Sequence, residues 1–257
     1  MVAIKGQFVW YELMTSDLEG ALAFYQSVVG WTAASAGNPA MDYRLLSAGG
    51  TMVAGAMAIP EAACAEGMRP CWTLYVGAAG TDATATSIEA AGGKILRPPE
   101  DIPGVGRFAI VADPQGAPFG IIAWTDEMEA PAQSMAPGHI GWHELYAGDE
   151  PTIFAFYDRV FGWEKADAMD MGPMGLYQLF RTRPGDATGG IMTKTPEIPH
   201  PFWNFYFNVD DIDAATARVT AGGGTIIQPA MEVPGGAWII QGLDPQGAFF
   251  SLVGPRT

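Results

Sequence analysis

Two glutamates lie in nearly identical local sequences and are the side chains of this chain best suited to acid–base chemistry. Glu12 belongs to the segment WYEL and Glu144 to the segment WHEL. In a strand, every second side chain points to the same face. That face would carry Trp10 and Met14 beside Glu12, and Trp142 and Tyr146 beside Glu144. A carboxylate shielded from water has a raised pKa and can accept a substrate proton near neutral pH. A hydrogen-bonded carboxylate can equally have a structural role alone.

Both segments belong to a duplication that spans most of the chain. Trp142 lies 132 residues after Trp10, and Asp244 of the second DPQG segment lies 131 residues after Asp113 of the first. An offset that stays nearly constant between such distant positions indicates two copies of one domain. The two glutamates therefore occupy equivalent positions in the two repeats.

The length and composition of the chain suit two modest domains. It has 257 residues, of which 49% are hydrophobic and 16% are charged, which is a globular composition. The stretch from Thr125 to Pro137 is acidic, contains proline and has no periodicity, as a connector between domains would. We expect a first domain over residues 1–126, a linker over 127–137 and a second domain over 138–257.

The elements that must position the glutamates follow from periodicity. Residues 8–14 have the spacing of a strand and residues 18–29 that of a helix, with Asp17 and Gly30 where its N-cap and C-cap belong. The order strand, helix and three strands then occurs twice in each repeat, which gives four units and an α+β fold. The further elements expected in the first repeat are strands at 32–36, 43–46, 51–57 and 72–76, a helix at 82–91, and strands at 94–97, 107–112 and 119–124.

The charge balance argues against several classes of partner. The formal net charge is −15 and the sequence pI about 4.4, so the field of the chain repels polyphosphate and anionic membrane surfaces. No cationic start followed by an apolar run appears, and no stretch approaches the ~18 consecutive apolar residues of a spanning helix. We expect a cytoplasmic monomer or homodimer that binds neither nucleic acid nor membrane.

Other catalytic motifs are missing from the sequence. Cys64 and Cys71, expected in a loop and a strand, have no counterparts in the second repeat and are interpreted as incidental thiols. The glycine-rich stretches at 104–106 and 222–224 lack the Lys and Ser/Thr of a nucleotide-binding loop and are typical of turns between strands. No Gly-x-Ser-x-Gly segment marks a hydrolase nucleophile.

Four features together resemble one known family. They are the first-strand pattern, an aspartate that opens a helix containing Phe-Tyr, the Gly-Trp after that helix, and a last strand preceded by Asp-Pro-x-Gly. The combination is similar to the vicinal oxygen chelate superfamily, which includes glyoxalase I, bleomycin resistance proteins, extradiol dioxygenases and methylmalonyl-CoA epimerase. The resemblance covers nearly the whole chain. It implies two tandem glyoxalase-like domains, each of two βαβββ units that form an incomplete barrel, but no single activity.

The resemblance also implies eight positions that could hold a metal. In catalytic members of that superfamily, His, Gln or Glu side chains from the first and last strands bind a divalent ion at the barrel mouth. Matched by spacing, with two positions in each repeat less securely placed, these are Trp10, near Gly55, Thr73 and Gly120, and Trp142, near Gly190, Asn204 and Ser251.

None of these eight residues is a metal ligand of the needed kind. We therefore expect no metal and no other cofactor, and a metal-dependent dioxygenase is disfavoured. The alternative is a site built on His139, His143 and His200. Histidines that pack in the core or lie at the surface are the simpler interpretation.

In the superfamily geometry the glutamate face is the barrel interior, where an unpaired carboxylate is costly. Thr73 and Asn204 are equivalent to the tryptophan positions, so Tyr75 and Tyr206, two residues on, would lie level with the glutamates. A tyrosine hydroxyl that donates to a glutamate would remove most of the penalty and form an acid–base couple. The catalytic candidates are Glu12, Glu144, Tyr75 and Tyr206, and the ligand-binding candidates are Trp10, Met14, Trp142, Tyr146, Thr73, Asn204 and Ser251.

Aromatic and methionine residues would surround these acids. The set includes Tyr43 and Met57 in the first repeat and Tyr177 and Met192 in the second, and it suits a planar or cationic small molecule. Ordinary core packing is the alternative for each of them.

We expect a protein that binds a small organic molecule in one or both barrel clefts without the metal of the superfamily. The first alternative is a glyoxalase-like lyase or isomerase that uses Glu12 or Glu144 as general base. The second is a structural module that has lost ligand binding.

Overall fold

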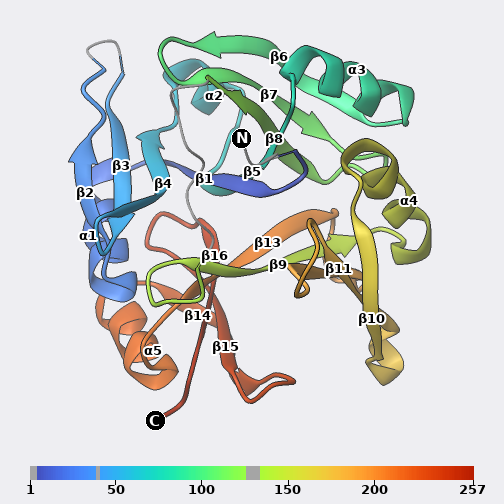
Figure 1. The fold of residues 1–257 in the computed structure, drawn as a ribbon. Coiled ribbons are helices and arrows are strands. Elements are labelled where there is room, and N and C mark those ends of the chain that lie inside the picture. The colour runs from blue at the N-terminus through green and yellow to red at the C-terminus, as the bar shows by residue number, and fades with distance from the viewer. Residues whose placement is uncertain (1–4, 39–40, 126–133) are drawn as a thin grey trace. The chain divides into compact units, whose positions relative to one another are not determined.

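The computed structural model describes residues 5–38, 41–125 and 134–257, and Figure 1 shows its ribbon. Four times along this part of the chain, a strand is followed by a helix and three further strands, which confirms the predicted unit order. The elements of the first two units are β1 (Phe8–Thr15), α1 (Leu18–Val29), β2 (Thr32–Ser35), β3 (Tyr43–Ala48), β4 (Thr51–Ala58), α2 (Glu61–Ala65), β5 (Cys71–Gly77), α3 (Thr81–Ala90), β6 (Lys94–Ile102), β7 (Gly106–Ala112) and β8 (Pro118–Trp124). Those of the last two are β9 (Ile140–Ala147), α4 (Glu150–Phe161), β10 (Glu164–Asp170), η1 (Gly172–Met174), β11 (Leu176–Arg181), β12 (Gly189–Thr193), β13 (Phe202–Asn208), α5 (Ile212–Ala221), β14 (Thr225–Glu232), β15 (Trp238–Leu243) and β16 (Phe249–Gly254).

The strands form two open sheets of eight strands each. Their orders are β2-β3-β4-β1-β5-β8-β7-β6 and β10-β11-β12-β9-β13-β16-β15-β14. Within each unit the first and last strands pair in parallel, as β1 does with β4 and β13 with β16, and the hairpins are antiparallel. Because each sheet ends in two edge strands, neither is closed. This architecture confirms the predicted α+β fold of two repeats, each with two βαβββ units.

Helix α1 shows why the local prediction succeeds. Its buried face carries Leu18, Ala21, Leu22, Tyr25 and Val28. The Asp17 carboxylate accepts a hydrogen bond from the backbone N–H of Gly20, and Gly30 ends the helix at a φ of 85°. An aspartate satisfies an N–H that the first turn leaves without an intrahelical partner, and glycine adopts a positive φ at little cost. The helix therefore begins and ends where the sequence predicts.

Two local expectations were wrong. Cys64, expected in a loop, lies on the short helix α2. The glycines at 222–224 follow α5, so that turn joins a helix to a strand rather than two strands. The turn at 104–106 does join strands β6 and β7, as expected. Of the predicted linker, residues 127–133 lie outside the described residues.

The chain packs into two compact units that do not follow the order of the repeats. One unit combines residues 1–9, 73–130 and 142–204, as far as they are described, and the other combines 10–72, 131–141 and 205–257. Apart from strand ends, the first unit holds β5 to β8 with β9 to β12, and the second holds β1 to β4 with β13 to β16. Each unit therefore contains half of each repeat. The division at 127–137 stays a prediction about the sequence repeats.

A buried relay, in which an indole donates to a phenol and the phenol donates to a carboxylate, joins the two repeats inside the first compact unit. The Trp203 indole Nε1 donates to the Tyr157 hydroxyl at 3.0 Å, and this hydroxyl donates to the Asp113 carboxylate at 3.0 Å. Asp113 is the aspartate of the first DPQG segment, and Tyr157 lies on α4 of the second repeat. Burial raises the pKa of Asp113, and its hydrogen bonds to Tyr157 and to backbone N–H groups oppose that effect.

The second unit contains the matching relay with the repeats exchanged. The Trp72 indole Nε1 donates to the Tyr25 hydroxyl at 2.8 Å, which donates to the Asp244 carboxylate at 3.0 Å.

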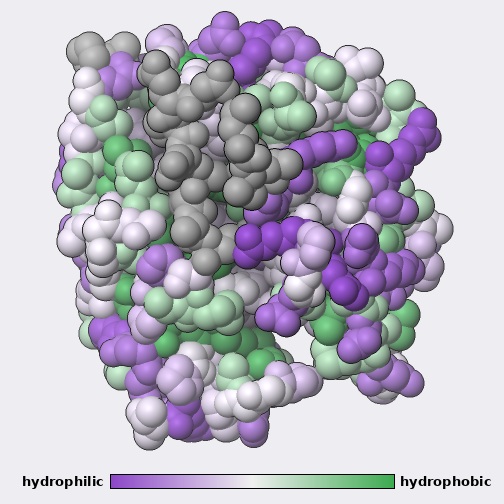
Figure 2. Space-filling view, viewed as in Figure 1, coloured by the Kyte–Doolittle hydropathy of each residue, from purple (hydrophilic) through white to green (hydrophobic). Residues whose placement is uncertain are grey.

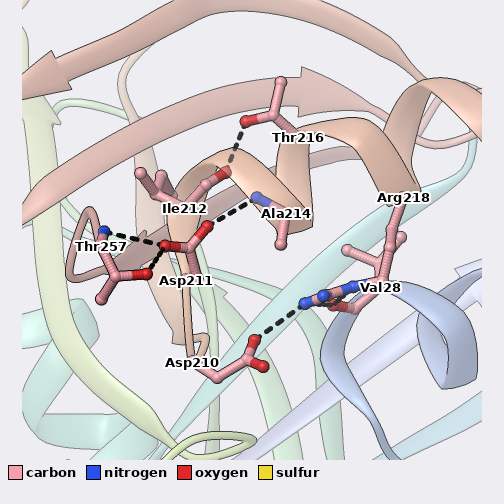
Figure 3. Close-up of polar contacts among 8 residues, drawn as sticks. All are labelled: Val28, Asp210, Asp211, Ile212, Ala214, Thr216, Arg218 and Thr257. Carbon is pink, nitrogen blue, oxygen red and sulfur yellow. Dashed lines mark hydrogen bonds and ion pairs between the residues drawn. The ribbon is translucent and has the colours of Figure 1, made fainter.

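In the second compact unit, helix α1 packs against helix α5. The Arg218 guanidinium on α5 donates to the backbone carbonyl of Val28 in the last turn of α1 and pairs with Asp210, as Figure 3 shows. A cation at a helix C-terminus is favourable because the carbonyl ends there carry partial negative charge.

Hydrophilic side chains gather at the top of the view in Figure 2, over the edge strand β6. On this strand Arg97 forms an ion pair with Glu100, and both side chains are exposed.

Within residues 5–38, 41–125 and 134–257, no helix is long and apolar enough to cross a membrane.

Candidate binding site

Strand β9 positions the site of the second repeat, which lies wholly within the first compact unit. Along the strand, Trp142, Glu144 and Tyr146 are half-buried, whereas His143 and Leu145 are buried. This alternation confirms that the glutamate shares a face with the tryptophan and the tyrosine and that His143 points the other way.

Three neutral donors hold the carboxylate of Glu144. The Tyr177 hydroxyl donates to Oε1 at 2.8 Å, and the Tyr146 hydroxyl donates to Oε2 at 3.2 Å. The Asn204 side-chain amide donates to Oε2 at 3.4 Å. These hydrogen bonds fix the orientation of the carboxylate on the face of β9 that also carries Trp142 and Tyr146.

Tyr177 is the middle member of a second kind of relay. The Trp142 indole Nε1 donates to the Tyr177 hydroxyl at 2.8 Å, so this hydroxyl accepts from an indole and donates to a carboxylate. Burial and the nearby negative charge of Glu144 both raise the pKa of Tyr177. Tyr177 therefore stays a neutral donor at physiological pH.

The first repeat carries the same relay in the second compact unit. The Trp10 indole Nε1 donates to the Tyr43 hydroxyl at 2.9 Å, and that hydroxyl donates to Glu12 Oε2 at 2.9 Å. Burial, followed by the charge of Glu12, raises the pKa of Tyr43. Trp10 is buried, while Glu12 and Met14 are half-buried on the same strand face. Two copies of one acid site thus exist.

The tyrosines that donate to the glutamates are not the ones predicted from the sequence. Tyr43 and Tyr177 were expected only as apolar lining, and the hydroxyl role was expected of Tyr75 beside Glu12 and of Tyr206 beside Glu144. Each of those two expected pairs combines residues of different compact units, and it stays a prediction. Within its own unit, Tyr75 is buried, and the buried Tyr206 accepts a hydrogen bond from the Gln241 side-chain amide at 3.3 Å.

A signal for the missed tyrosines exists in the glycines of the neighbouring strands. A side chain at Gly55 on β4 would collide with the phenol of Tyr43, and one at Gly190 on β12 would collide with the phenol of Tyr177. Both glycines lie opposite a glutamate in the parallel register, Gly55 beside Glu12 and Gly190 beside Glu144. A glycine in a strand marks a place where another group approaches closely.

The other sequence-predicted ligand-binding residues have different environments. Thr73 is half-buried on β5, and Asn204 is buried and bonded to Glu144. Ser251 is fully buried and pairs with Tyr206 in the parallel register of β13 and β16.

The positions that the family resemblance assigns to a metal do not fit one. Their side chains are indole, hydroxyl and amide groups or the hydrogen of glycine, which do not form a tight chelating set. The rings of Tyr43 and Tyr177 fill the space that side chains at Gly55 and Gly190 would need, and the ring of Tyr75 does the same at Gly120. Among the residues that the structure describes, no three His, Cys, Asp or Glu side chains are grouped as a metal site would need.

The histidines that the alternative metal site would use have other roles or places. His143 stacks on Phe8, with ring centroids 3.8 Å apart, and its Nδ1 lies 3.0 Å from the Thr188 carbonyl oxygen. Burial lowers the pKa of His143 to about 3. His139 lies with Nδ1 3.3 Å from the Pro137 carbonyl, and His200 is exposed.

Comparison with known proteins places these features in a wider group. A family model described as Glyoxalase/Bleomycin resistance protein/Dioxygenase superfamily matches residues 7–121 and 137–252. The chain is 43% identical over 251 residues to the "Putative glyoxylase CFP32" of Mycobacterium tuberculosis, covering 96% of this chain and 94% of the relative. It is 31% identical over 261 residues to the "Anthracycline biosynthesis protein DnrV" of Streptomyces peucetius, covering 96% and 93%.

Solved structures share the fold at low sequence identity. The Mn(II)-bound glyoxalase of Novosphingobium aromaticivorans superposes with a TM-score of 0.64 at 18% identity, over 98% of this chain and 82% of that one. The 2,3-dioxygenase LapB of Pseudomonas sp. KL28 superposes with a TM-score of 0.66 at 12% identity, over 99% and 94%. At such identities the likeness shows the fold alone.

Proposed function

Because the chain belongs to the Glyoxalase/Bleomycin resistance protein/Dioxygenase superfamily, we propose that it binds a small planar or cationic organic molecule at its acid sites, without the metal of the superfamily. The observation that carries the proposal is the setting of Glu144. Its carboxylate accepts hydrogen bonds from Tyr177, Tyr146 and Asn204. It lies on the strand face that also carries the half-buried aromatic rings of Trp142 and Tyr146. A negative group beside π faces attracts cations and flat rings.

The duplicated relay supports the proposal. The two repeats have diverged, yet the Trp, Tyr and Glu relay is present in both with nearly the same distances. An orienting indole and phenol fix where the carboxylate points, which is what a binding group requires. The relatives that are named for anthracycline biosynthesis favour the planar part of the ligand class.

A thermal-shift and calorimetric panel of small planar, cationic and neutral molecules tests the proposal. We expect saturable ligands whose affinity falls at least tenfold in Glu12→Gln or Glu144→Gln, while the melting temperature changes little. Glutamine keeps the size and most hydrogen bonds of glutamate and removes the charge. Glu232→Gln, an exposed exchange on β14, is the control for the loss of one charge. Ligand affinity unaltered in both site variants would leave the carboxylates a structural role alone.

The second candidate is a glyoxalase-like lyase or isomerase. The contact between the Glu144 carboxylate and the Tyr177 hydroxyl favours it, because the carboxylate could take a proton from a substrate carbon and return it to the neighbouring carbon while the phenol donates a hydrogen bond. The relatives named glyoxylase point the same way. Turnover of methylglyoxal hemithioacetal by protein purified without chelator, lost in Glu144→Gln, would support this candidate. Elemental analysis of the same sample reports any bound metal.

A further inference from the structure

The two acid sites differ at one matched strand position. Within its own sheet, Met14 on β1 lies opposite Met57 of β4, which lies opposite Tyr43 of β3. In the other sheet, Tyr146 on β9 lies opposite Met192 of β12, which lies opposite Tyr177 of β11. Opposed residues of neighbouring strands share a face. The two rows are therefore equivalent, except that the first ends in a methionine and the second in a tyrosine.

A second difference lies at the start of the following strand. Cys71 is the first residue of β5 and Phe202 the first residue of β13, and each precedes the tryptophan of a buried relay, Trp72 or Trp203. The second repeat thus replaces a thioether and a thiol by two aromatic rings.

Those two rings form one element beside the carboxylate. The rings of Tyr146 and Phe202 are parallel within 6°, with centroids 4.9 Å apart, and both residues are half-buried. The hydroxyl of the same Tyr146 donates to Glu144 at 3.2 Å. Half-burial leaves part of the surface of both residues open to solvent. Flat rings stack favourably on aromatic side chains. The carboxylate next to this pair attracts positive charge on such a ring.

We infer that the second repeat alone is built for flat aromatic cations, and that Tyr146 and Phe202 determine this specificity. The inference rests on the proposed function and deepens it. A ring of the ligand stacks on the aromatic pair, and the positive charge lies close to Glu144. The first repeat has the carboxylate but Met14 and Cys71 in place of the pair, so each chain takes one such ligand.

Proflavine, a flat aromatic cation, and cyclohexylammonium, a cation without a flat ring, are the probes. They are titrated into the full chain by calorimetry at 150 mM NaCl, where the Debye length is about 8 Å and the attraction to the net charge is largely screened. We expect one proflavine per chain. The exchange Tyr146→Met with Phe202→Cys should weaken proflavine at least tenfold and change cyclohexylammonium less than twofold.

The reciprocal exchange is the stronger test because it predicts a gain. Met14→Tyr with Cys71→Phe should raise the number of bound proflavine molecules from one to two. Tyr146→Phe keeps the ring and removes the hydroxyl, and it should retain proflavine affinity within about threefold. If the loss variant does not fold, as judged by circular dichroism, the gain variant and Tyr146→Phe decide the question.

Two equal proflavine sites in the wild type, no proflavine binding, or a change of less than twofold on exchange would overturn the inference. These outcomes differ from failure of the proposed function. That proposal fails only if no molecule of the wider panel binds in a manner that depends on Glu12 or Glu144.

Discussion

The hydroxyl of Tyr157 lies 3.0 Å from a carboxylate oxygen of Asp113 and donates a hydrogen bond to it. Both groups are buried, and they come from different repeats of the sequence. Tyr25 and Asp244 repeat the contact in the other compact unit. In each compact unit, the Phe-Tyr segment of one repeat is therefore the partner of the DPQG segment of the other repeat.

Removing the phenol of Tyr157 should destabilise the protein. In Tyr157→Phe, the Asp113 carboxylate loses a donor in a buried place, so we expect the free energy of unfolding at pH 7 to fall by about 1–3 kcal/mol. Tyr25→Phe should cost a similar amount because its environment is matched. Urea denaturation followed by fluorescence measures both. A cost below about 0.3 kcal/mol in both variants would contradict a stabilising role for the relays.

Histidine 143 should make the stability of the protein depend on pH. Burial lowers its pKa to about 3 in the folded state, against 6.5 for the group in its ordinary environment. Below the ordinary value the unfolded chain binds a proton that the folded chain does not, so stability falls as the pH drops towards 3. We expect this histidine to contribute about 1.4 kcal/mol per pH unit in that range.

The variant His143→Phe isolates that contribution. It keeps the stack on Phe8 and removes the titrating group, although it also loses the contact with the Thr188 carbonyl. The difference in unfolding free energy between wild type and variant should shift in favour of the variant as the pH falls from 6.5 to 4. A difference that is independent of pH would show that His143 is not held neutral.

Glutamate 150 should be a site where a substitution stabilises the protein. The residue is 2% exposed, and its Oε1 has no hydrogen-bond partner among the described residues. Burial raises its pKa, and Lys165 opposes this. The matching residue of the first repeat is the buried Leu18. We expect Glu150→Leu to raise the unfolding free energy at pH 7 by about 1 kcal/mol. This net value already subtracts the favourable interaction of the Glu150 charge with the helix N-terminus, which leucine loses.

The gain from Glu150→Leu should depend on pH in a defined direction. A raised pKa in the folded state means that the cost of the charge is complete above that pKa and is relieved as the pH falls towards the unfolded value. The advantage of leucine should therefore shrink between pH 7 and pH 4. Glu150→Gln serves as the control that removes the charge and keeps the polar group. An advantage that grows on acidification would contradict this account.

The glycine next to Glu144 should not tolerate a methyl group. In Gly190→Ala the added Cβ would collide with the Tyr177 phenol, so the relay must shift and the free energy of unfolding should fall by about 1–3 kcal/mol. Gly80→Ala is the control, because nothing lies within 4 Å of its Cβ and its φ is −169°. Its cost as a helix N-cap should stay below about 1 kcal/mol. Equal costs at the two positions would argue against a close fit of the phenol.

The sequence was sufficient for features that depend on short-range order. Helix α1 is specified by the Asp17 cap, an apolar stripe and Gly30, all within a few turns, so its bounds could be predicted to the residue. The face of Glu144 follows from the period of a single strand. These features depend on neighbours in the chain, which a single sequence displays directly.

Contacts between strands that lie far apart in the sequence could not be predicted from local patterns. The hydroxyl of Tyr177 reaches Glu144 because β11 and β9 flank β12 in one register, and a shift of one residue would turn the ring to the other face. The pairing of Tyr157 with Asp113 depends on which halves of the two repeats pack together. Several long-range arrangements suit the same repeated pattern, so the pattern alone could not choose between them.

The interleaved units have a consequence for how the chain acquires its structure as it is synthesised. Residues 10–72 leave the ribosome early, yet their compact unit is complete only when residues 205–257 have followed. The other unit, with most of its residues in 73–204, has all of its segments available sooner, once residue 204 has emerged. Nascent chains fold as their interacting parts emerge. Residues 10–72 therefore wait longest for their partners, and during that interval the Tyr25 phenol on α1 lacks the Asp244 carboxylate to which it donates in the folded protein.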